Sequence, residues 1–509
     1  MAASPRLSKS RFTAGLQCPR LLWWKVHEPD APELVPDAMT QLRFEEGTEV
    51  GERARAYVPG GKLIDLPHDR ITEKVEMTRA ALGAGARVVY EASFFADRTF
   101  AAVDILECVD GGFGLIEVKS SVEVKPEHLP DAAFQAHVLR RAGLDVRRVE
   151  LMHLNRDCIH PDLSNLFVRE DVTGEVEALL PGIPAQIESL LEVLAGPLPG
   201  AGPGAQCANP NECPFQSRCW ADLPEHHVTT LYYSGRKAWD WVASGLHTIH
   251  DLPAGLRIHP AAERQRRSVQ AGRMIVEPGL AAALAPFDPP IAYLDFETVA
   301  PAIPVWPGCH PYDAIPVQFS CHAQARGGGI RHSEWIADGP ADPRAEIARR
   351  VVEACADARS VAAYYSVFER DCLRRLASAV DPDLAARVRD VEARLVDPLP
   401  IVRDHVYDPD FGGSFSLKSV LPVLVPDLSY DDMDVAEGTA ATLELKHLLF
   451  EGDAIEPAER ARSREALRRY CELDTWAMLK LIEALHGLAG GDGSGKTATR
   501  RRSPRPRDL

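Results

Sequence analysis

The chain has 509 residues, of which 45% are hydrophobic and 26% are charged, and its formal net charge is −17. This length exceeds what one hydrophobic core usually serves, so two or three domains are expected. The composition is that of an ordinary globular protein, and the negative balance argues against nonspecific nucleic-acid binding over the whole surface. We find no apolar run of transmembrane length and no hydrophobic leader near Met1, so a cytoplasmic location without a membrane partner is expected.

Two breaks rich in proline and glycine suggest the domain boundaries. LPGAGPGA (198–205) follows a long helical pattern, and APFDPP (285–290) precedes an apolar strand pattern. The end of the chain has no periodicity and is rich in arginine, which is typical of a disordered basic tail. The predicted parts are an N-terminal unit (1–225), a small helical linking segment (226–285), a C-terminal unit (286–487) and the tail (488–509).

In the N-terminal unit, FAAVDILECVDGGFGLIEVKSS (100–121) predicts two strands joined by the hairpin loop VDGGFG. Asp104 lies in the first strand. Glu117 and Lys119 lie two positions apart in the second strand, so they share one face of it. An E-x-K pair alone is a weak signal, because an ordinary surface ion pair on a strand has the same sequence.

The surrounding residues make the pattern more specific. Asp104 followed by Glu117-x-Lys119 resembles the PD-(D/E)XK nucleases. That resemblance implies that Asp104 and Glu117 bind Mg²⁺, while Lys119 polarises water or stabilises charge on the phosphate. Gln135, in the helix predicted next, matches the glutamine motif of the family. Glu91, in VVYEASFF, matches its acid on the preceding strand.

Four cysteines lie near the two ends of this predicted unit. Cys18 is close to the amino terminus, and Cys207, Cys213 and Cys219 follow the first break. They resemble the ligands of iron–sulfur RecB-like nucleases, in which four thiolates hold a 4Fe–4S cluster. The long interval between Cys207 and Cys213 leaves Zn²⁺ as an alternative, and four unrelated thiols are another. The other cysteines lie singly in apolar surroundings and are expected in the core: Cys108, Cys158, Cys309, Cys321, Cys355, Cys372 and Cys471.

The C-terminal unit begins with IAYLDFET (291–298), which predicts a buried strand because β-forming residues dominate it. Asp295 and Glu297 then point to the same face. Two carboxylates on one face repel each other unless a cation lies between them, and Mg²⁺ or Mn²⁺ prefers such oxygen ligands. The alternative is an ordinary core strand with two solvated acids.

Two later segments offer further acids. In VAAYYSVFERDCLRRLA (361–377) an apolar stretch is followed by helical spacing. Glu369 would therefore lie where a strand leads into a helix, a position at which α/β folds bind ligands. LRRYCELDTWAMLKLIEAL (467–485) predicts an amphipathic helix on which Tyr470 and Asp474, four residues apart, share a face.

These three motifs, in this order, resemble the DnaQ-like 3′–5′ exonucleases of the RNase H-like fold, in the DEDDy branch that carries a tyrosine. The resemblance spans about residues 290–486. It includes GSFSLKSVLPVL (413–424), which is similar to the segment that precedes the last helix in such enzymes.

The resemblance implies two-metal hydrolysis of phosphodiester bonds, with Tyr470 orienting the attacking water. The family usually has aspartate where this chain has Glu369, and Asp371 is the alternative ligand. The implied metal ligands are Asp295, Glu297, Glu369 and Asp474.

The whole chain is therefore expected to be an α/β protein. An iron–sulfur PD-(D/E)XK domain would precede an RNase H-like mixed sheet flanked by helices, an order that resembles a bacterial family of RecB-like nucleases fused to an uncharacterised RNase H-like domain. The expected activity is Mg²⁺- or Mn²⁺-dependent cleavage of nucleic acid, with DNA favoured over RNA. Two alternatives stay open: one domain is catalytic while the other only binds nucleic acid, or the chain is a noncatalytic scaffold that recruits repair or defence proteins.

Overall fold

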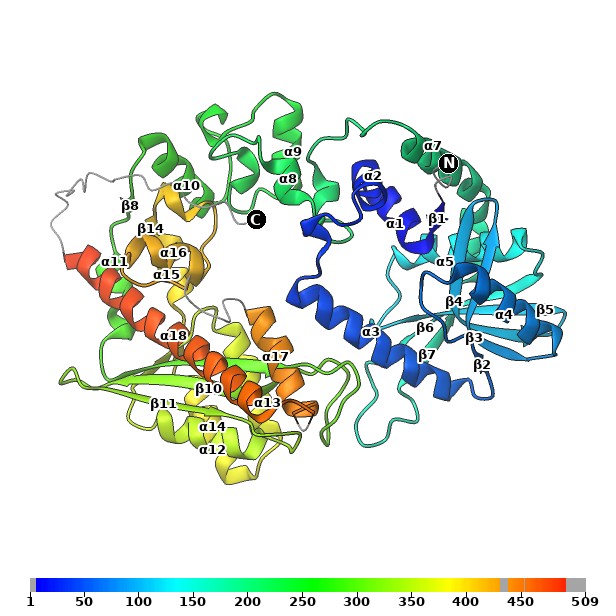
Figure 1. The fold of residues 1–509 in the computed structure, drawn as a ribbon. Helices are drawn as coiled ribbons and strands as arrows, with labels where there is room; N and C mark the ends of the chain where they lie inside the picture. The colour runs from blue at the N-terminus through cyan, green and yellow to red at the C-terminus, as the bar shows by residue number, and fades with distance from the viewer. Residues whose placement is uncertain (1–5, 431–437, 453, 491–509) are drawn as a thin grey trace. The chain divides into compact units, whose positions relative to one another are not determined.

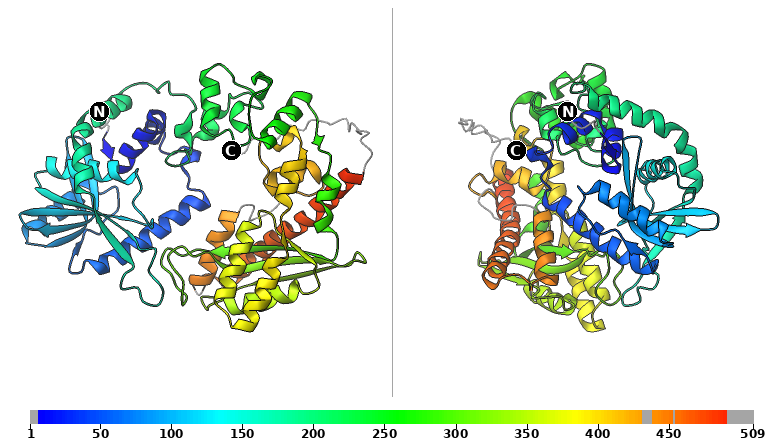
Figure 2. Two further views of the ribbon diagram at one scale, coloured as in Figure 1. Left: turned by 180° about the vertical axis from the view of Figure 1, so that it is seen from behind. Right: turned by 45° about the vertical axis from the view of Figure 1, so that its right-hand side comes forward.

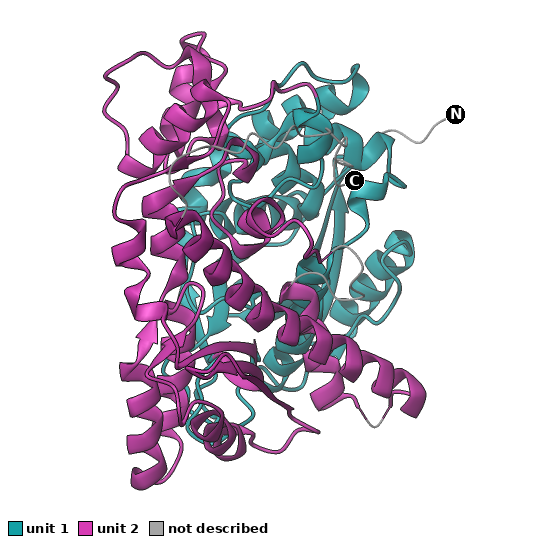
Figure 3. Ribbon diagram, turned by 90° about the vertical axis from the view of Figure 1, so that its left-hand side faces the viewer, with its two compact units in different colours: residues 1–221, 301–313 teal, residues 222–300, 314–509 magenta. Residues whose placement is uncertain are grey.

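The computed structural model describes residues 6–430, 438–452 and 454–490. Its fold is mixed α/β with open sheets, which confirms the predicted class (Figures 1 and 2). The chain divides into two compact units, shown in different colours in Figure 3. Most of the predicted basic tail, residues 491–509, lies outside the described residues.

The two units differ in detail from the predicted parts. Unit 1 comprises Met1–Ala221 and Pro301–Asp313, and unit 2 comprises Asp222–Ala300 and Ala314–Leu509. The predicted linking segment belongs to unit 2, where its apolar side chains share a core with the C-terminal strands and helices. Residues 301–313 follow the LDFET strand but belong to unit 1, because Ala302 and Ile303 pack in a cluster of unit 1 side chains.

Unit 1 is built on a seven-stranded sheet in the order β2-β3-β4-β5-β6-β7, with β1 paired to β4. The β3–β4, β4–β5 and β6–β7 pairs are antiparallel, whereas β5 and β6 run parallel. The strands are β1 (Leu7–Ser8), β2 (Lys62–Leu63), β3 (Val88–Ala96), β4 (Thr99–Val109), β5 (Gly112–Lys119), β6 (Val146–Leu154) and β7 (Phe167–Asp171).

The helices of unit 1 cover this sheet, and α5 packs in its main core through Phe134 and Val138. The hairpin between β4 and β5 is tighter than predicted, because Gly111 adopts a positive φ of 81° and β5 begins at the next residue. The helices are α1 (Lys9–Gln17), α2 (Pro19–His27), η1 (Pro32–Leu34), α3 (Ala38–Tyr57), α4 (Ile71–Gly83), α5 (His128–Arg141), α6 (Thr173–Leu179), η2 (Leu180–Gly182), α7 (Ile183–Ala195), η3 (Ala205–Cys207) and α8 (Gln216–Trp220).

Among the described residues, one helical segment, Thr173–Ala195, is long and apolar enough by length and composition to cross a membrane. The sequence-based prediction did not single out this segment, whose mean hydropathy of 1.3 is low for a membrane span. Its apolar side chains, including Ile183, Leu190 and Leu194, pack in the main core of unit 1. One face of the segment thus packs against the core of unit 1, and the cytoplasmic location stays a prediction.

Unit 2 contains a five-stranded sheet in the order β11-β10-β9-β12-β13. The β11–β10 and β10–β9 pairs are antiparallel, and the β9–β12 and β12–β13 pairs are parallel. A separate antiparallel pair joins β8 and β14. The strands are β8 (Ile275–Val276), β9 (Ile291–Val299), β10 (Ile315–Gln324), β11 (Ile330–Ile336), β12 (Ser360–Ala362), β13 (Leu395–Val396) and β14 (Val406–Tyr407).

The central strand β9 explains how the two faces of this sheet are used. Leu294 and Phe296 pack with α12, α13 and α14, whereas Tyr293 packs with α18 on the opposite face (Figures 1 and 2). By strand alternation, Asp295 and Glu297 share the face of Tyr293. The helices are η4 (Val228–Thr230), α9 (Arg236–Ala243), η5 (Ile249–Asp251), α10 (Pro260–Ala271), α11 (Leu280–Ala283), η6 (Ala285–Phe287), α12 (Arg344–Ala354), α13 (Val367–Ser378), α14 (Pro382–Ala393), α15 (Pro398–His405), η7 (Pro409–Phe411), α16 (Leu417–Leu424), α17 (Gly438–Phe450) and α18 (Pro457–Gly490).

Candidate metal centres

In unit 2 three predicted ligands lie close together. Asp295 and Glu297 come from β9, and Asp474 comes from α18, which lies across the same face of the sheet. Each offers a carboxylate oxygen, and these oxygens all lie within 4.8 Å of one another. Strand alternation and helical spacing therefore bring together residues almost 180 positions apart in the sequence.

Glu369 lies in the first turn of α13 and is 3% exposed. Its Oε2 atom is buried and has no hydrogen-bond partner in the structure. Its charge contributes to the raised pKa values of Asp295 and Glu297, so it faces the same group of acids. Asp371, the alternative, has a side chain that is 61% exposed and pairs with Arg374. The helix thus turns Glu369 inward and Asp371 outward.

Two tyrosines and a lysine surround Asp474. The Tyr430 hydroxyl donates to Asp474 Oδ1 at 2.5 Å. Tyr470, one helical turn before Asp474, is buried and accepts a hydrogen bond from Lys418 Nζ at 3.3 Å. Lys418 lies on α16, in the predicted 413–424 segment, and its ammonium lies over both tyrosine rings. Tyr430 and Lys418 had no role in the sequence prediction.

The acids of this centre hold their protons unusually strongly. Burial and the neighbouring carboxylates raise the pKa of Asp295 and of Glu297 well above the usual values. Burial raises the pKa of Asp474 to about 6 and that of Glu369 to about 8. The charge of Lys418 opposes the rise at Glu297 and at Asp474. Ionising all four acids together therefore requires added positive charge.

A cysteine predicted as core packing also touches this centre. Cys471 is buried on α18, and its thiol lies 3.5 Å from Asp295 Oδ2. Of the other six cysteines predicted in the core, Cys108 is half-buried and the rest are buried.

In unit 1 the second set of predicted residues meets around Glu117. Lys119 Nζ lies 2.8 Å from Glu117 Oε1, and Gln135 Nε2 donates to Glu117 Oε2 at 2.8 Å. Asp104 Oδ2 accepts a hydrogen bond from the backbone N–H of Val118 at 2.7 Å, across the β4–β5 pair. The structure thus brings Asp104, Glu117, Lys119 and Gln135 together.

Two further residues of this centre escaped the sequence analysis. Lys9, on α1, donates to Glu117 Oε1 at 2.7 Å, although it lies 108 positions away in the sequence. Asp131, on α5, accepts from Lys119 Nζ at 2.6 Å. The helix was predicted only from residue 134, but it begins at His128 and so presents Asp131 one turn before Gln135.

Glu91 lies at the margin of this group. It adopts a positive φ of 57° within β3, and its carboxylate pairs with Arg55 at 3.3 Å. Its charge still contributes to the raised pKa of Asp104. Glu91 therefore lies near the centre, with its side chain turned toward an arginine.

The electrostatics of unit 1 differ from those of unit 2. Burial would raise the pKa of Glu117, but Lys119 and Lys9 hold it below the usual range. Burial and the charge of Glu117 raise the pKa of Asp104 to about 7. Two ammonium groups thus neutralise much of the negative charge in this centre.

A cavity of about 940 Å³ opens beside this centre. Lys119 and Asp131 reach its wall, together with Lys25 and Arg43. Tyr312, from the 301–313 segment, also lines it and donates a hydrogen bond to the carbonyl of Ser120. The cavity therefore connects the carboxylate centre with solvent, and both cationic and acidic side chains line it.

The four cysteines from the two ends of unit 1 are neighbours. The pKa of Cys213 is raised to about 11 by burial and by the nearby Cys207, Cys18 and Cys219. Cys213 donates its backbone N–H to the carbonyl of Cys207 at 2.8 Å. The Cys18, Cys213 and Cys219 side chains pack around the buried Phe215. The four thiols, all within the described residues, are thus near one another without a compact group of three ligand atoms within 4.8 Å among them, and thiolates are ligands that suit an iron–sulfur cluster or Zn²⁺.

Comparison with known families gives one match. A model described as a domain of unknown function, DUF2779, matches residues 292–416. The matched stretch begins within β9 and includes Asp295, Glu297 and Glu369, but it ends before α18. No curated protein matches the chain.

Proposed function

We propose that this protein is a metal-dependent nuclease whose principal active site lies on unit 2. The observation that carries the proposal is the convergence of three carboxylates within 4.8 Å, beside a fourth whose buried oxygen has no partner. Such a group of acids is costly to bury without a cation. All its donors are oxygen atoms, which suits Mg²⁺ or Mn²⁺.

The arrangement of unit 2 supports an RNase H-like domain of the DnaQ type. Three antiparallel strands followed by two parallel ones place the D-x-E motif on the central strand. Tyr470 and Asp474 lie on the last long helix, across that strand. These positions of the motifs on strand and helix support the resemblance.

In this site, bound Mg²⁺ or Mn²⁺ would activate water and neutralise the charge that develops on the phosphate. Asp295, Glu297, Glu369 and Asp474 would hold the ions. Tyr470 directs a hydroxyl toward these carboxylates, where it can orient the attacking water. Lys418 holds the Tyr470 hydroxyl in place through its hydrogen bond. The ammonium of Lys418 would also add positive charge beside the phosphate of a bound substrate.

We further propose that unit 1 is an iron–sulfur nuclease domain of the PD-(D/E)XK type. Asp104 and Glu117 would hold Mg²⁺, with Lys119 facing the attacked phosphate. The four cysteines would hold a 4Fe–4S cluster that joins the two ends of unit 1, with Zn²⁺ as the alternative. The cavity beside Lys119 has room for part of a nucleic-acid strand, with DNA favoured, and Lys25, Arg43 and Lys125 in its wall would contact the phosphates.

One observation favours a second role for unit 1, in which it binds nucleic acid without cleaving it. Lys9 already occupies Glu117 Oε1 at 2.7 Å, so an ammonium group lies where a metal ion would otherwise bind. A metal must displace this lysine before Glu117 can act as a ligand.

The test is cleavage of end-labelled single-stranded and duplex DNA and RNA in Mn²⁺. The wild type is compared with the near-isosteric variants Asp295→Asn and Asp104→Asn. Loss of a 3′-end ladder in Asp295→Asn supports the unit 2 site. If Asp295→Asn cleaves as the wild type does and Asp104→Asn is inactive, the activity belongs to unit 1. No Mn²⁺-dependent cleavage of any substrate would overturn the proposal.

A further inference from the structure

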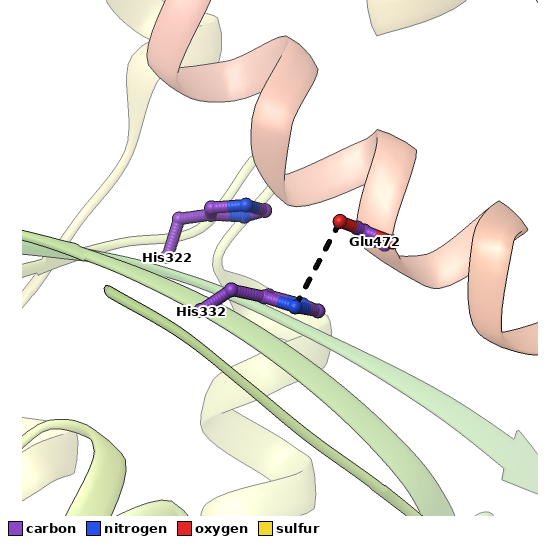
Figure 4. Close-up of side chains that lie close together, drawn as sticks. All are labelled: His322, His332 and Glu472. Atoms are coloured by element: carbon purple, nitrogen blue, oxygen red, sulfur yellow. Dashed lines mark ion pairs between the residues drawn. The ribbon is translucent and has the colours of Figure 1, made fainter. Parts of the chain in front are cut away.

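A second group of potential metal ligands lies under α18, apart from the carboxylates. His322 on β10, His332 on β11 and Glu472 on α18 each present one ligand atom, and these atoms all lie within 4.8 Å of one another (Figure 4). The nuclease proposal gives none of the three a role. Their donor set, two imidazoles and one carboxylate, differs in kind from the all-oxygen centre.

The fold fixes the two histidines side by side. His322 and His332 are directly opposite each other in the antiparallel β10–β11 pair. Glu472 lies between Tyr470 and Asp474 in the sequence of α18 and reaches His332 Nδ1 at 3.8 Å. Two adjacent strands and the helix that crosses them therefore each contribute one ligand.

Each imidazole has one nitrogen engaged by a hydroxyl group. His322 Nδ1 lies 2.8 Å from Thr475 Oγ1, and His332 Nε2 lies 2.9 Å from Ser320 Oγ. Ser320 and Thr475 are themselves 2.8 Å apart. Such contacts orient metal-binding histidines, because they fix one ring nitrogen and leave the other for the ion. In this site, His322 Nε2 and His332 Nδ1 are the nitrogens available to bind an ion.

Burial also favours the neutral form of His322, which is the form that binds a metal ion. Burial lowers the pKa of His322 to about 4, with a further contribution from His332. His322 is therefore neutral near pH 7, as a metal ligand must be.

We propose that His322, His332 and Glu472 form a binding site for a transition-metal ion of the Zn²⁺ class. Imidazole nitrogen suits Zn²⁺ or Co²⁺, whereas Mg²⁺ prefers oxygen ligands. Three protein ligands leave a fourth position for water. The site is separate from the proposed nuclease centre and does not depend on that function.

Binding requires one ring to turn. The two imidazoles stack with centroids 4.4 Å apart and an angle of 22° between their planes. A single ion cannot lie in both of two nearly parallel ring planes at bonding distance. His332 is the ring that turns, because its side chain is 25% exposed whereas His322 is buried.

Metal binding at this site would crosslink α18 to the sheet. The ion would join Glu472 to β10 and β11 at the helical turn that also carries Tyr470 and Asp474. Metal at this site would therefore stabilise the part of α18 that contributes to the oxygen centre.

The experiment is a Co²⁺ titration of the full-length protein with its cysteine site loaded, in excess Mg²⁺ to fill the oxygen centre. Visible absorption reports Co²⁺ coordination, and a sulfur charge-transfer band would reveal binding to thiolates instead. The proposal predicts one Co²⁺ per chain without that band. Zn²⁺ should displace it.

The decisive variants are Glu472→Gln and His332→Gln, with Glu465→Gln as the matched control. Glu465 also lies on α18, and its side chain is 55% exposed against 50% for Glu472. We expect Glu472→Gln to weaken Co²⁺ binding at least about tenfold and Glu465→Gln to leave it unchanged. His332→Gln should abolish this binding, and Asp295→Asn should retain it. Equal affinity in wild type and Glu472→Gln, or no Mg²⁺-resistant Co²⁺ binding in the wild type, would overturn the proposal.

Discussion

The two carboxylate centres of this protein handle buried negative charge in opposite ways. In unit 1, Glu117 contacts Lys9 and Lys119, and its pKa is lowered. In unit 2, Asp295 and Glu297 lie beside further acids, and their pKa values are raised. The first centre is neutralised largely by its own side chains, whereas the second lacks such neutralisation. We therefore expect the unit 2 centre to depend more strongly on divalent metal.

The largest expected effect is the loss of unit 2 activity in Asp295→Asn. Removing one of the converging charges should lower metal-dependent 3′-end cleavage by about a thousandfold or more, since the metal supplies several kcal/mol of charge stabilisation. Asp371→Asn is the control, because Asp371 is exposed and points away from the centre. The rate at which label is released from a 3′-labelled strand measures the activity of each variant. If Asp371→Asn lost as much activity as Asp295→Asn, Asp371 would belong to the metal centre, which would contradict the assignment of Glu369 as the ligand on α13.

Tyr470→Phe should have the next largest effect. The change removes one hydroxyl and leaves the carboxylates in place, so we expect the cleavage rate to fall about a hundredfold with Mn²⁺ affinity retained. Single-turnover cleavage and Mn²⁺ calorimetry separate the two quantities. A loss of Mn²⁺ binding equal to the loss of rate would show that Tyr470 only supports the ligands.

The unit 2 acids also predict how stability depends on pH. A carboxyl group whose pKa is higher in the folded state destabilises the fold as pH rises, because folded protein binds the proton more tightly. The pKa of Asp474 is raised to about 6 and that of Glu369 to about 8, so metal-free protein should lose stability between about pH 4 and pH 8. The loss should be of the order of a few kcal/mol.

Thermal unfolding in EDTA and in Mg²⁺ measures this dependence. Mg²⁺ should raise the melting temperature more at pH 8 than at pH 5.5, because ionised carboxylates bind it. The Asp295→Asn variant should show a smaller difference between the two pH values. A metal effect that is independent of pH would mean that these acids are already ionised without the ion.

The smallest predicted effect concerns Lys9. Lys9→Met removes an ammonium that competes with metal for Glu117, so we expect unit 1 to bind Mn²⁺ about fivefold more tightly, the scale of one partly exposed ion pair. Lys25→Met is the control, since Lys25 lines the same cavity without an ion pair to Glu117 in the structure. Calorimetry in an Asp295→Asn background isolates unit 1. Weaker binding in Lys9→Met would show that Lys9 holds Glu117 in its binding position.

The sequence predicted the parts of these centres that follow from local periodicity. Alternation along β9 places Asp295 and Glu297 on one face, and four-residue spacing on α18 places Tyr470 beside Asp474. In unit 1, Glu117 and Lys119 share one face of β5 for the same reason. These relations need only the geometry of a single strand or helix.

Other residues could not be predicted because tertiary contacts place them. Lys9 reaches Glu117 only because α1 packs beside the sheet, and Asp131 depends on where α5 begins. His322 and His332 form a pair only in the register of β10 and β11. The predicted C-terminal unit (286–487) included residues 301–313, but the packing of Ala302 and Ile303 assigns them to unit 1.

Mn²⁺ binding to the two carboxylate centres is the most direct test of this account. Calorimetry would compare the wild type with Asp295→Asn and Asp104→Asn at pH 7.5. The account predicts that Asp295→Asn removes the tighter Mn²⁺ sites and that Asp104→Asn leaves them in place. If Asp104→Asn instead removes the tighter binding, unit 1 holds the principal metal centre, and the contrast between the two sites is contradicted.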